Sequence, residues 1–291
     1  MPSYPFVTVD VFTDTRFGGN PLAVFTDARG LSDADMQSLA NEMNLSETTF
    51  VLPPSDPAHT ARVRIFNTTA EMPFAGHPMI GTGWVLAQRG LGQDGLLTFE
   101  VPAGLVEVRA GPQGADISAP RPLATGLELP VEAIAACAGL SPGDLVTSNH
   151  KPVVASVGID FVFAEVAAEA LSRATPDVTA FRKTVAATAG LDPQRLSIHL
   201  YAHDGAGKLR ARMFAPLAGT FEDPATGSAN ATLAALLLSL SEAEAAEFDI
   251  VQGVEMGRPS RLHAAARWTA DGVRATIGGG CAPMLRGEAE L

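Results

Sequence analysis

Hydrophobic and polar positions along the chain switch repeatedly between a period of two and a period of 3.6 residues. Strands are predicted at "FVTVDVF", which alternates and ends at the turn "RFGGNP", and at "PLAVF". A helix that Ser32 can cap follows, because its apolar positions recur with the helical period. Strands at "TTFVLP" and "ARVRIF" and a helix at "HPMIGTGWVLAQRG", closing at Gly90, come next. This order predicts a protein of the α/β (α+β) class.

The pattern is interrupted once near the middle of the chain. After three short predicted strands, residues 120–130, "PRPLATGLELP", are rich in proline and glycine and are the best candidate for a linker. Beyond it we expect helices at "VEAIAACAGL" and "DVTAFRKTVAATAG", strands at "PVVASVG", "DFVFAEV", "RLSIHLYA" and "KLRARMFAP", and several short strands at the end. We therefore expect a first half over residues 1–119 and a second half from residue 120 onward.

A short internal repeat relates the two halves. In each copy a strand and a long loop lead to a glycine turn and then to a helix, so that Gly76 corresponds to Gly227 and His77 to Ser228. The matching stretches are "RVRIF" (62–66) with "RARMF" (210–214), and "EMPFAGHP" (71–78) with "EDPATGSA" (222–229).

The two helices of the repeat are apolar, or made of very small residues, on nearly every side. They contain "MIGTGWVLA" and "ANATLAALLLSL". A helix with this composition is buried all round, so strands must wrap it. The sequence therefore predicts two similar halves, each a shell of strands around a core helix, with two helix N-termini that could face a shared cleft.

Composition and charge make several functions poor candidates. Of the 291 residues, 46% are apolar and 18% charged, which is typical of a globular protein with a substantial core. Acidic residues outnumber basic ones 32 to 20, for a net charge of −12, so nucleic acid and membrane surfaces are not expected partners. The first residues lack the pattern of a signal peptide, and no apolar run is long enough to span a bilayer.

The cysteines and histidines predict neither disulfide bonds nor a metal site. Cys137 and Cys281 form neither a disulfide framework nor a metal-binding spacing, which fits a reducing cytoplasm. The six histidines show no HExxH or paired spacing, so we expect no bound metal.

The loop "FEDPATGSAN", residues 221–230, resembles a phosphate-binding turn that enters a helix but has no lysine. A helix N-terminus attracts carboxylates as well as phosphates. Because Glu222 and Asp223 are acidic, a small carboxylate with an amino or hydroxyl group suits the loop better, and Asp223 would accept a hydrogen bond from that group. The alternative is an ordinary strand-to-helix turn in which Asp223 is a local cap. The matching loop in the other half favours binding.

Two further residues carry possible acid–base chemistry. His77 is placed at a glycine turn that opens a buried helix; it is either a proton carrier or a hydrogen-bonded structural residue. Glu47, in "NLSETTF", enters a strand directly after a helix. Taken alone it would be an exposed carboxylate, but between apolar walls its pKa would rise toward neutrality and it could take and return a proton.

Five stretches together identify a family resemblance. They are "FGGNPLAVF", "NLSETTF", "FAGHPMIGTGWVL", "EDPATGSAN" and "GVEMGRPS". In this order, from residue 17 to residue 260, they resemble the PhzF family of phenazine-biosynthesis isomerase-like proteins. The resemblance implies the diaminopimelate-epimerase-like fold, with two pseudo-symmetric halves, each a curled mixed sheet around a central buried helix, and an active site in the cleft between them. It also implies that a final strand, residues 280–291, returns to the first half, which leaves residues 120–279 to the second.

The resemblance also implies an activity and a set of site residues. The best-known member isomerises trans-2,3-dihydro-3-hydroxyanthranilate without cofactor or metal, by moving a proton from C3 to C1 of the ring, and the glutamate that moves it corresponds to Glu47. His77 and Asp223 would join it in the catalytic set. The substrate-binding set would be Ser228, Gly76, Gly227, Thr226 and, as a shaper of its loop, Asn20. A homodimer is expected from the family; a small-molecule carboxylate as substrate and a cytoplasmic location are the expectations given above.

Two alternatives remain open beside this isomerase. One is a one-base epimerase or racemase of an amino or hydroxy acid on the same fold, and the other is a non-catalytic metabolite-binding protein. Related epimerases and proline racemases use two cysteines, one from each loop. Because neither Cys137 nor Cys281 lies in either loop, racemisation by two thiols is disfavoured.

Overall fold

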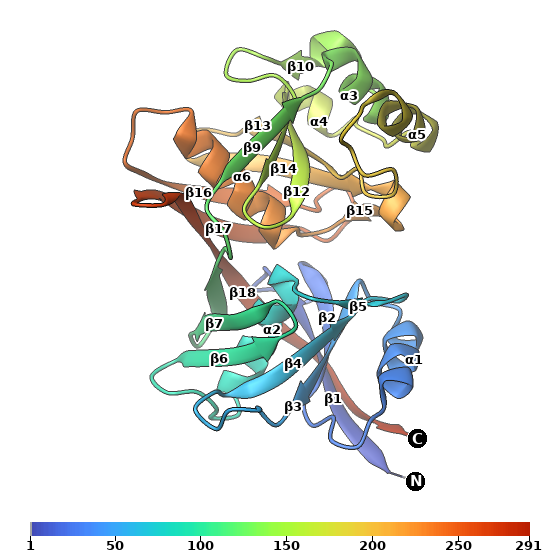
Figure 1. Ribbon diagram of the computed structural model, residues 1–291, viewed down its shortest axis with the longest axis vertical. Coiled ribbons are helices and arrows are strands. Elements are labelled where there is room, and N and C mark those ends of the chain that lie inside the picture. Colours follow the sequence, from blue (N-terminus) through green and yellow to red (C-terminus); the bar gives the residue numbers. More distant parts are fainter. Residues whose placement is uncertain (1) are drawn as a thin grey trace. The chain divides into compact units, whose positions relative to one another are not determined.

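The computed structural model describes residues 2–291, and the chain forms two compact units (Figure 1). One unit runs to Ser118 and also contains Gly278–Leu291, and the other is Ala119–Ile277. The chain passes back to the first unit within its last strand, β18 (Gly272–Glu290). Among the described residues, no helix is both long and apolar enough to cross a membrane.

The first unit is a mixed sheet that closes on itself. Its strands pair in the order β1, β2, β3, β4, β6, β7, β8 and β18, and β18 pairs again with β1. Two of these pairings, β2 with β3 and β4 with β6, are parallel, and each is connected through a helix. The elements are β1 (Ser3–Val11), β2 (Asn20–Phe25), α1 (Asp33–Met43), β3 (Glu47–Leu52), β4 (Ala61–Phe66), β5 (Glu71–Met72), α2 (Gly76–Ala87), β6 (Leu96–Val101), β7 (Gly104–Ala110) and β8 (Gly114–Ser118).

The second unit repeats the pairing pattern of the first. The parallel pairs are now β12 with β13 and β14 with β16, and the antiparallel pairs β13–β14, β14–β15 and β16–β17 match β3–β4, β4–β5 and β6–β7. The antiparallel pair of β10 with β12 is an addition in the second unit. Its elements are β9 (Ala124–Glu128), α3 (Val131–Cys137), η1 (Pro142–Asp144), β10 (Leu145–Val146), β11 (Val153–Ser156), β12 (Asp160–Val166), α4 (Ala168–Leu171), α5 (Val178–Ala187), β13 (Ile198–His203), β14 (Lys208–Ala215), η2 (Pro216–Ala218), β15 (Thr220–Asp223), α6 (Gly227–Ser239), β16 (Ala245–Gln252) and β17 (Ser260–Thr269). The short repeat in the sequence therefore marks a repeat of the whole architecture.

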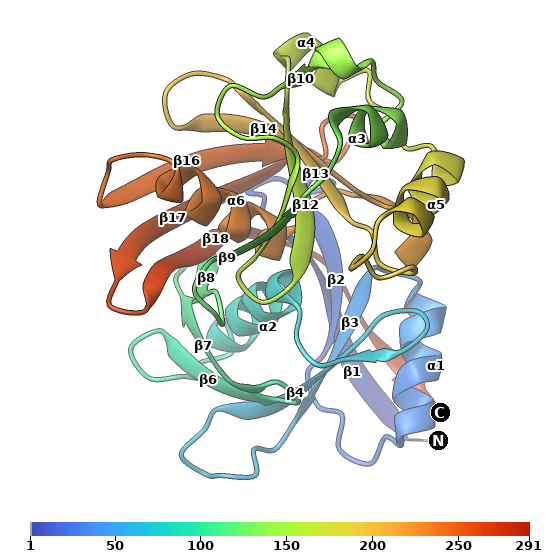
Figure 2. The same ribbon diagram turned by 45° about the horizontal axis from the view of Figure 1, so that its top comes forward.

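A core helix lies among the strands of each unit (Figure 1, Figure 2). Every residue of α2 is buried except Trp84 and Ala87, which are half-buried. In α6 only Ser228, Leu237 and Ser239 are half-buried, and the rest are buried. The prediction of two core helices wrapped by strands is confirmed.

An arginine clamp occupies equivalent positions in the two copies. Arg64 donates two hydrogen bonds to Glu71, and its guanidinium lies 5.0 Å from the centre of the Phe66 ring. In the second unit Arg212 donates two hydrogen bonds to Glu222 and lies 4.9 Å from the centre of the Phe214 ring. Bidentate pairing of this kind fixes the start of the loop that leads to each core helix.

Two predictions from the sequence were wrong: the linker at residues 120–130 and the short strands at the end of the chain. The proposed linker, residues 120–130, contains the strand β9, which is exposed throughout and is held by main-chain pairing with β11. Because no face of β9 is buried, it shows no hydrophobic alternation. The short strands expected at the end of the chain are long, and β18 alone has 19 residues. Its glycines, in "IGGGCAPM", hide the strand pattern, although residues 281–283 of this segment pair with β1.

Gly83 lets the core helix of the first unit approach the sheet. A Cβ at this position would lie 2.4 Å from Val108 Cγ1. We expect Gly83→Ala to lower the free energy of unfolding by about 1–2 kcal/mol, because overpacking outweighs the roughly 1 kcal/mol gain in helix propensity. Urea unfolding would measure this. Gly143→Ala, where a Cβ meets no atom within 4 Å, is the control and should change little; equal stabilities of the two variants would contradict the packing argument.

Candidate active site

Glu47 is the first residue of β3, beside the start of the parallel strand β2. Its side chain is only 16% exposed. Burial raises the pKa of this carboxyl from 4.5 to about 7, and the neighbouring Ser46 side chain opposes the rise. Glu47 Oε2 is buried and accepts no hydrogen bond from any residue between 2 and 291. The carboxyl therefore has the burial and the proton affinity that acid–base chemistry near neutral pH requires.

His77 lies against this carboxyl. Its Nε2 atom is 3.5 Å from Glu47 Oε2, and its side chain is buried at the second position of α2. A hydrogen bond of 2.8 Å between the buried hydroxyls of Thr49 and Thr82 ties β3 to α2. Because Thr49 and Glu47 share one face of β3, this bond also sets the distance between Glu47 and the helix that carries His77.

Asn20 is linked to Glu47 through Ser46, a residue to which the sequence analysis assigned no role. The hydroxyl of Ser46 donates to Asn20 Oδ1 at 3.1 Å, and Asn20 is buried at the start of β2. The turn before Asn20 requires Gly19, which has a φ of 63° and would place a Cβ 2.3 Å from the Val11 carbonyl oxygen. The only signal for Ser46 was its position next to Glu47 in "LSET".

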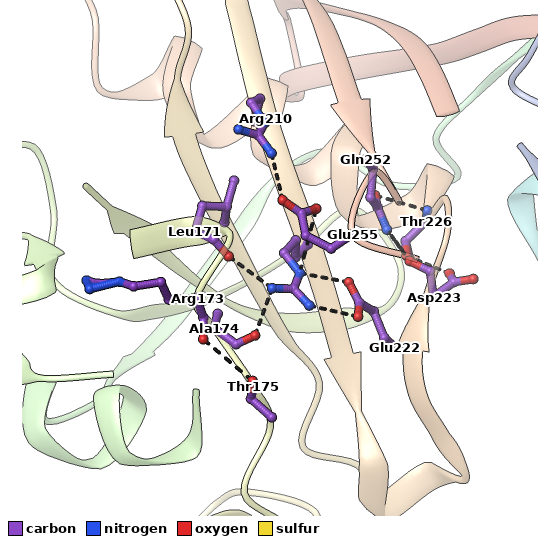
Figure 3. Close-up of polar contacts among 11 residues, drawn as sticks. Leu171, Arg173, Ala174, Thr175, Arg210, Glu222, Asp223, Thr226, Gln252 and Glu255 are labelled. Carbon is purple, nitrogen blue, oxygen red and sulfur yellow. Dashed lines mark hydrogen bonds and ion pairs between the residues drawn. The ribbon is translucent and has the colours of Figure 1, made fainter. Parts of the chain in front are cut away.

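The predicted residues of the second unit lie at the start of α6, and Figure 3 shows two of them, Asp223 and Thr226. Asp223 ends β15, Thr226 precedes the helix, and Gly227 and Ser228 are its first two residues. The Thr226 hydroxyl donates to Asp223 Oδ2 at 2.6 Å. Gly76, at the start of α2, holds the same place as Gly227.

Both core helices begin without a side-chain cap. Ala75 precedes α2 and Thr226 precedes α6, and in neither case does the side chain bond to the first turn of its helix. The first-turn N–H groups and the positive end of the helix dipole can therefore serve a carboxylate. This arrangement contrasts with α1, where Ser32 forms the predicted cap and exchanges hydrogen bonds with Asp35.

Glu222 has a structural place that the sequence analysis did not anticipate. The sequence predicts that Glu222, like Asp223, is an acid that faces the ligand of the loop. In the structure it accepts both hydrogen bonds from Arg212, whose guanidinium also donates to the carbonyl oxygens of Leu171 and Ala174 (Figure 3). The charge of Glu222 is therefore balanced inside the protein.

The cysteines have no part in either group. Cys137 is buried and lies 3.3 Å from the Thr184 hydroxyl, and burial raises the pKa of its thiol. Cys281 is also buried, which raises its pKa to about 12. Among residues 2–291, no three His, Cys, Asp or Glu side chains are grouped so as to hold a metal ion.

The raised pKa of Glu47 has a consequence for stability. Below pH 4.5 both folded and unfolded chains hold the proton; as the pH rises to about 7 only the unfolded chain releases it, so folding stability falls and stays low above pH 7. Glu47→Gln removes this loss. We expect the variant to be up to about 3 kcal/mol more stable than the wild type at pH 8 and equal to it near pH 4.5. Urea unfolding at both values tests this, and a difference that does not change with pH would contradict it.

Comparison with known proteins identifies the family. A family model described as phenazine biosynthesis-like protein matches residues 9–287. An uncharacterised isomerase of Mesorhizobium japonicum is 38% identical over 279 residues, which cover 90% of each chain. The trans-2,3-dihydro-3-hydroxyanthranilate isomerase of Pseudomonas aeruginosa is 36% identical over 296 residues, covering 98% of this chain and 99% of that protein.

Solved structures agree with these relatives. The crystal structure of a Bacillus anthracis phenazine biosynthesis protein of the PhzF family aligns over 100% of both chains with a TM-score of 0.89 and 25% identity. A probable proline racemase of Agrobacterium radiobacter, at 13% identity and a TM-score of 0.63 over 99% of this chain and 92% of its own, shares the fold. The fold and the relatives define an isomerase with the diaminopimelate-epimerase-like architecture. The chain belongs to the PhzF family.

Proposed function

We propose that this protein moves a proton between two carbons of a small amino or hydroxy carboxylic acid, with Glu47 as the acid–base group. One observation carries the proposal: Glu47 Oε2 is buried, accepts no hydrogen bond from the described residues, and lies 3.5 Å from His77 Nε2. A carboxyl whose pKa is about 7 can take a proton at neutral pH and return it.

A single base is enough for this reaction, because the proton that it removes from one carbon is returned to another. Glu47 takes a proton from one carbon of a conjugated substrate, the electron pair of that C–H bond enters the conjugated system, and the double bond shifts. The protonated Glu47 then delivers the proton to the carbon at the other end. Because the same carboxyl performs both steps and is restored, we propose that the reaction proceeds without a cofactor. His77, next to Glu47, would orient the substrate and help to relay the proton.

The remaining predicted residues would bind the substrate. The uncapped start of α6, at Gly227 and Ser228, suits a carboxylate, and Asp223 suits a neighbouring amino or hydroxyl group. The relative from P. aeruginosa is named for trans-2,3-dihydro-3-hydroxyanthranilate, which contains all three groups. We propose this compound, or one of the same class, as the substrate.

A substrate panel tests the proposal. The protein would be incubated with trans-2,3-dihydro-3-hydroxyanthranilate and with small amino and hydroxy acids, and products would be followed by NMR. A shifted double bond supports the isomerase, whereas inversion at one carbon of a panel acid would indicate the one-base epimerase. Binding without any reaction, at an affinity that Glu47→Gln leaves unchanged, would indicate a metabolite-binding protein and overturn the proposal.

A further inference from the structure

A chain of buried hydrogen bonds lies beneath Asp223. His199 Nε2 lies 3.1 Å from Asn230 Oδ1, and the Asn230 side chain lies 2.7 Å from that of Gln252. Gln252 in turn contacts the Thr226 hydroxyl at 3.1 Å and the Asp223 carbonyl oxygen at 2.8 Å (Figure 3). His199, Asn230 and Gln252 are completely buried. The sequence offers no reason to assign a role to these three, although Asn230 is the only amide side chain in a helix of mainly apolar and small residues.

Main-chain groups at the Thr226 end fix the direction of every bond in this chain. The Thr226 N–H can only donate, so the Gln252 atom that it contacts at 3.2 Å is the amide oxygen. The Asp223 carbonyl can only accept, so the Gln252 atom facing it is the amide nitrogen. Likewise the Thr226 carbonyl accepts from Asn230 Nδ2 at 3.0 Å, which leaves Asn230 Oδ1 to accept from His199.

The direction of these bonds determines what the Thr226 hydroxyl does. Its oxygen accepts a hydrogen bond from Gln252 Nε2, so its own proton is directed to Asp223 Oδ2. Thr226 stands at the position where a threonine side chain ordinarily accepts from the first turn of the helix, and it forms no such cap. The Thr226 hydroxyl therefore donates to Asp223 and does not cap the helix.

His199 supports this direction from the far end. Burial lowers the pKa of its ring to about 4, so the ring is neutral and carries one proton. That proton is on Nε2, because Asn230 Oδ1 can only accept it. His199 Nδ1 is buried and has no hydrogen-bond partner within residues 2–291.

We infer that Gln252, held by Asn230 and His199, is a positioning residue that turns the Thr226 hydroxyl toward Asp223 and so fixes the Asp223 carboxylate in one rotamer as a hydrogen-bond acceptor. The inference rests on the proposed function in one respect: Asp223 would then select substrates with an amino or hydroxyl group beside their carboxylate. The orientation of the Thr226 hydroxyl toward Asp223 follows from the hydrogen-bond chain and does not rest on the proposed function.

The first test measures the position of Asp223 without any ligand. Crystal structures of Thr226→Val and Thr226→Ser would be compared with the wild type. We expect Asp223 to change rotamer when the hydroxyl is removed in Thr226→Val and to stay in place when it is kept in Thr226→Ser. Gln252→Met tests the direction, because methionine cannot donate to Thr226 and so leaves the Thr226 hydroxyl free to rotate; it should displace Asp223 as well. An unmoved Asp223 in both Thr226→Val and Gln252→Met would overturn the inference.

The second test measures selectivity with two probes that differ by one amino group, anthranilate and benzoate. Calorimetry should show that the wild type and Thr226→Ser prefer anthranilate by about tenfold or more, and that Thr226→Val loses most of this preference. Thr184→Val, which removes the buried hydroxyl beside Cys137, controls for a general loss of packing and should keep the preference. A preference that is equal in Thr226→Val and the wild type would overturn the selective role. If neither probe binds the wild type, the proposed substrate class fails, while the crystal structures still decide the positioning.

Discussion

Glu47→Gln should lower the turnover number by about 10²–10⁴-fold and leave substrate affinity nearly unchanged. The glutamine has the same shape as glutamate, so the walls that bury the side chain and its contact with His77 are kept. It has no basic oxygen of comparable strength, so the proton cannot leave the substrate. Steady-state kinetics at pH 7–8 on the substrate found in the panel would measure the effect.

Glu42→Gln provides the matched control for this substitution. Glu42 is an exposed glutamate of α1 in the same unit, so the same chemical change there should leave turnover and affinity unaltered. A Glu47→Gln variant that retains wild-type turnover would show that another group handles the proton. A variant with normal turnover and weaker binding would show that Glu47 only holds the substrate.

Arg212→Met should reduce the free energy of unfolding by about 3–5 kcal/mol. The guanidinium is only 7% exposed and donates to Glu222 and to the carbonyl oxygens of Leu171 and Ala174. Methionine fills much of the volume but leaves Glu222 as a largely buried carboxylate without its cation, and it leaves two carbonyl groups without their donor. Urea unfolding at pH 7 would measure the loss.

Arg210→Met on the same strand is the control for the loss of one positive charge. Arg210 is 33% exposed and forms an ion pair with Glu255 at 2.6 Å. Because a partly exposed pair contributes little, this variant should lose about 1 kcal/mol or less. Equal losses in the two variants would contradict the account of Arg212 as a buried clamp. Arg64→Met, at the equivalent position of the first unit, should lose less than Arg212→Met, because its partners Glu71 and Asp33 are 32% and 84% exposed.

The architecture could be predicted from sequence largely because of the two core helices. The segments around Gly81 and Leu236 are apolar on all sides, and a helix of that kind must be enclosed. The repeat then indicated that the halves are alike. The strand β9 could not be predicted, because none of its residues is buried and only main-chain hydrogen bonds to β11 hold it.

The site could be predicted less completely, because it depends on contacts between distant segments. The resemblance to the PhzF family singled out Glu47 and His77, but their 3.5 Å contact follows from the packing of β3 against α2. The true surroundings of Glu222 depend on Arg212, ten residues earlier in the chain. Gln252 is further still from Thr226, and only the structure places its amide beneath the start of α6.

The most direct test of the central claim follows the transferred hydrogen itself. The reaction of trans-2,3-dihydro-3-hydroxyanthranilate, or of the panel compound that reacts, would be recorded by NMR in D₂O. With Glu47 present, we predict loss of the C–H signal at the donor carbon together with the appearance of hydrogen or deuterium at the receiving carbon. With Glu47→Gln, both events should be slower by about 10²-fold or more. Equal rates for the two proteins would contradict the assignment of Glu47 as the acid–base group.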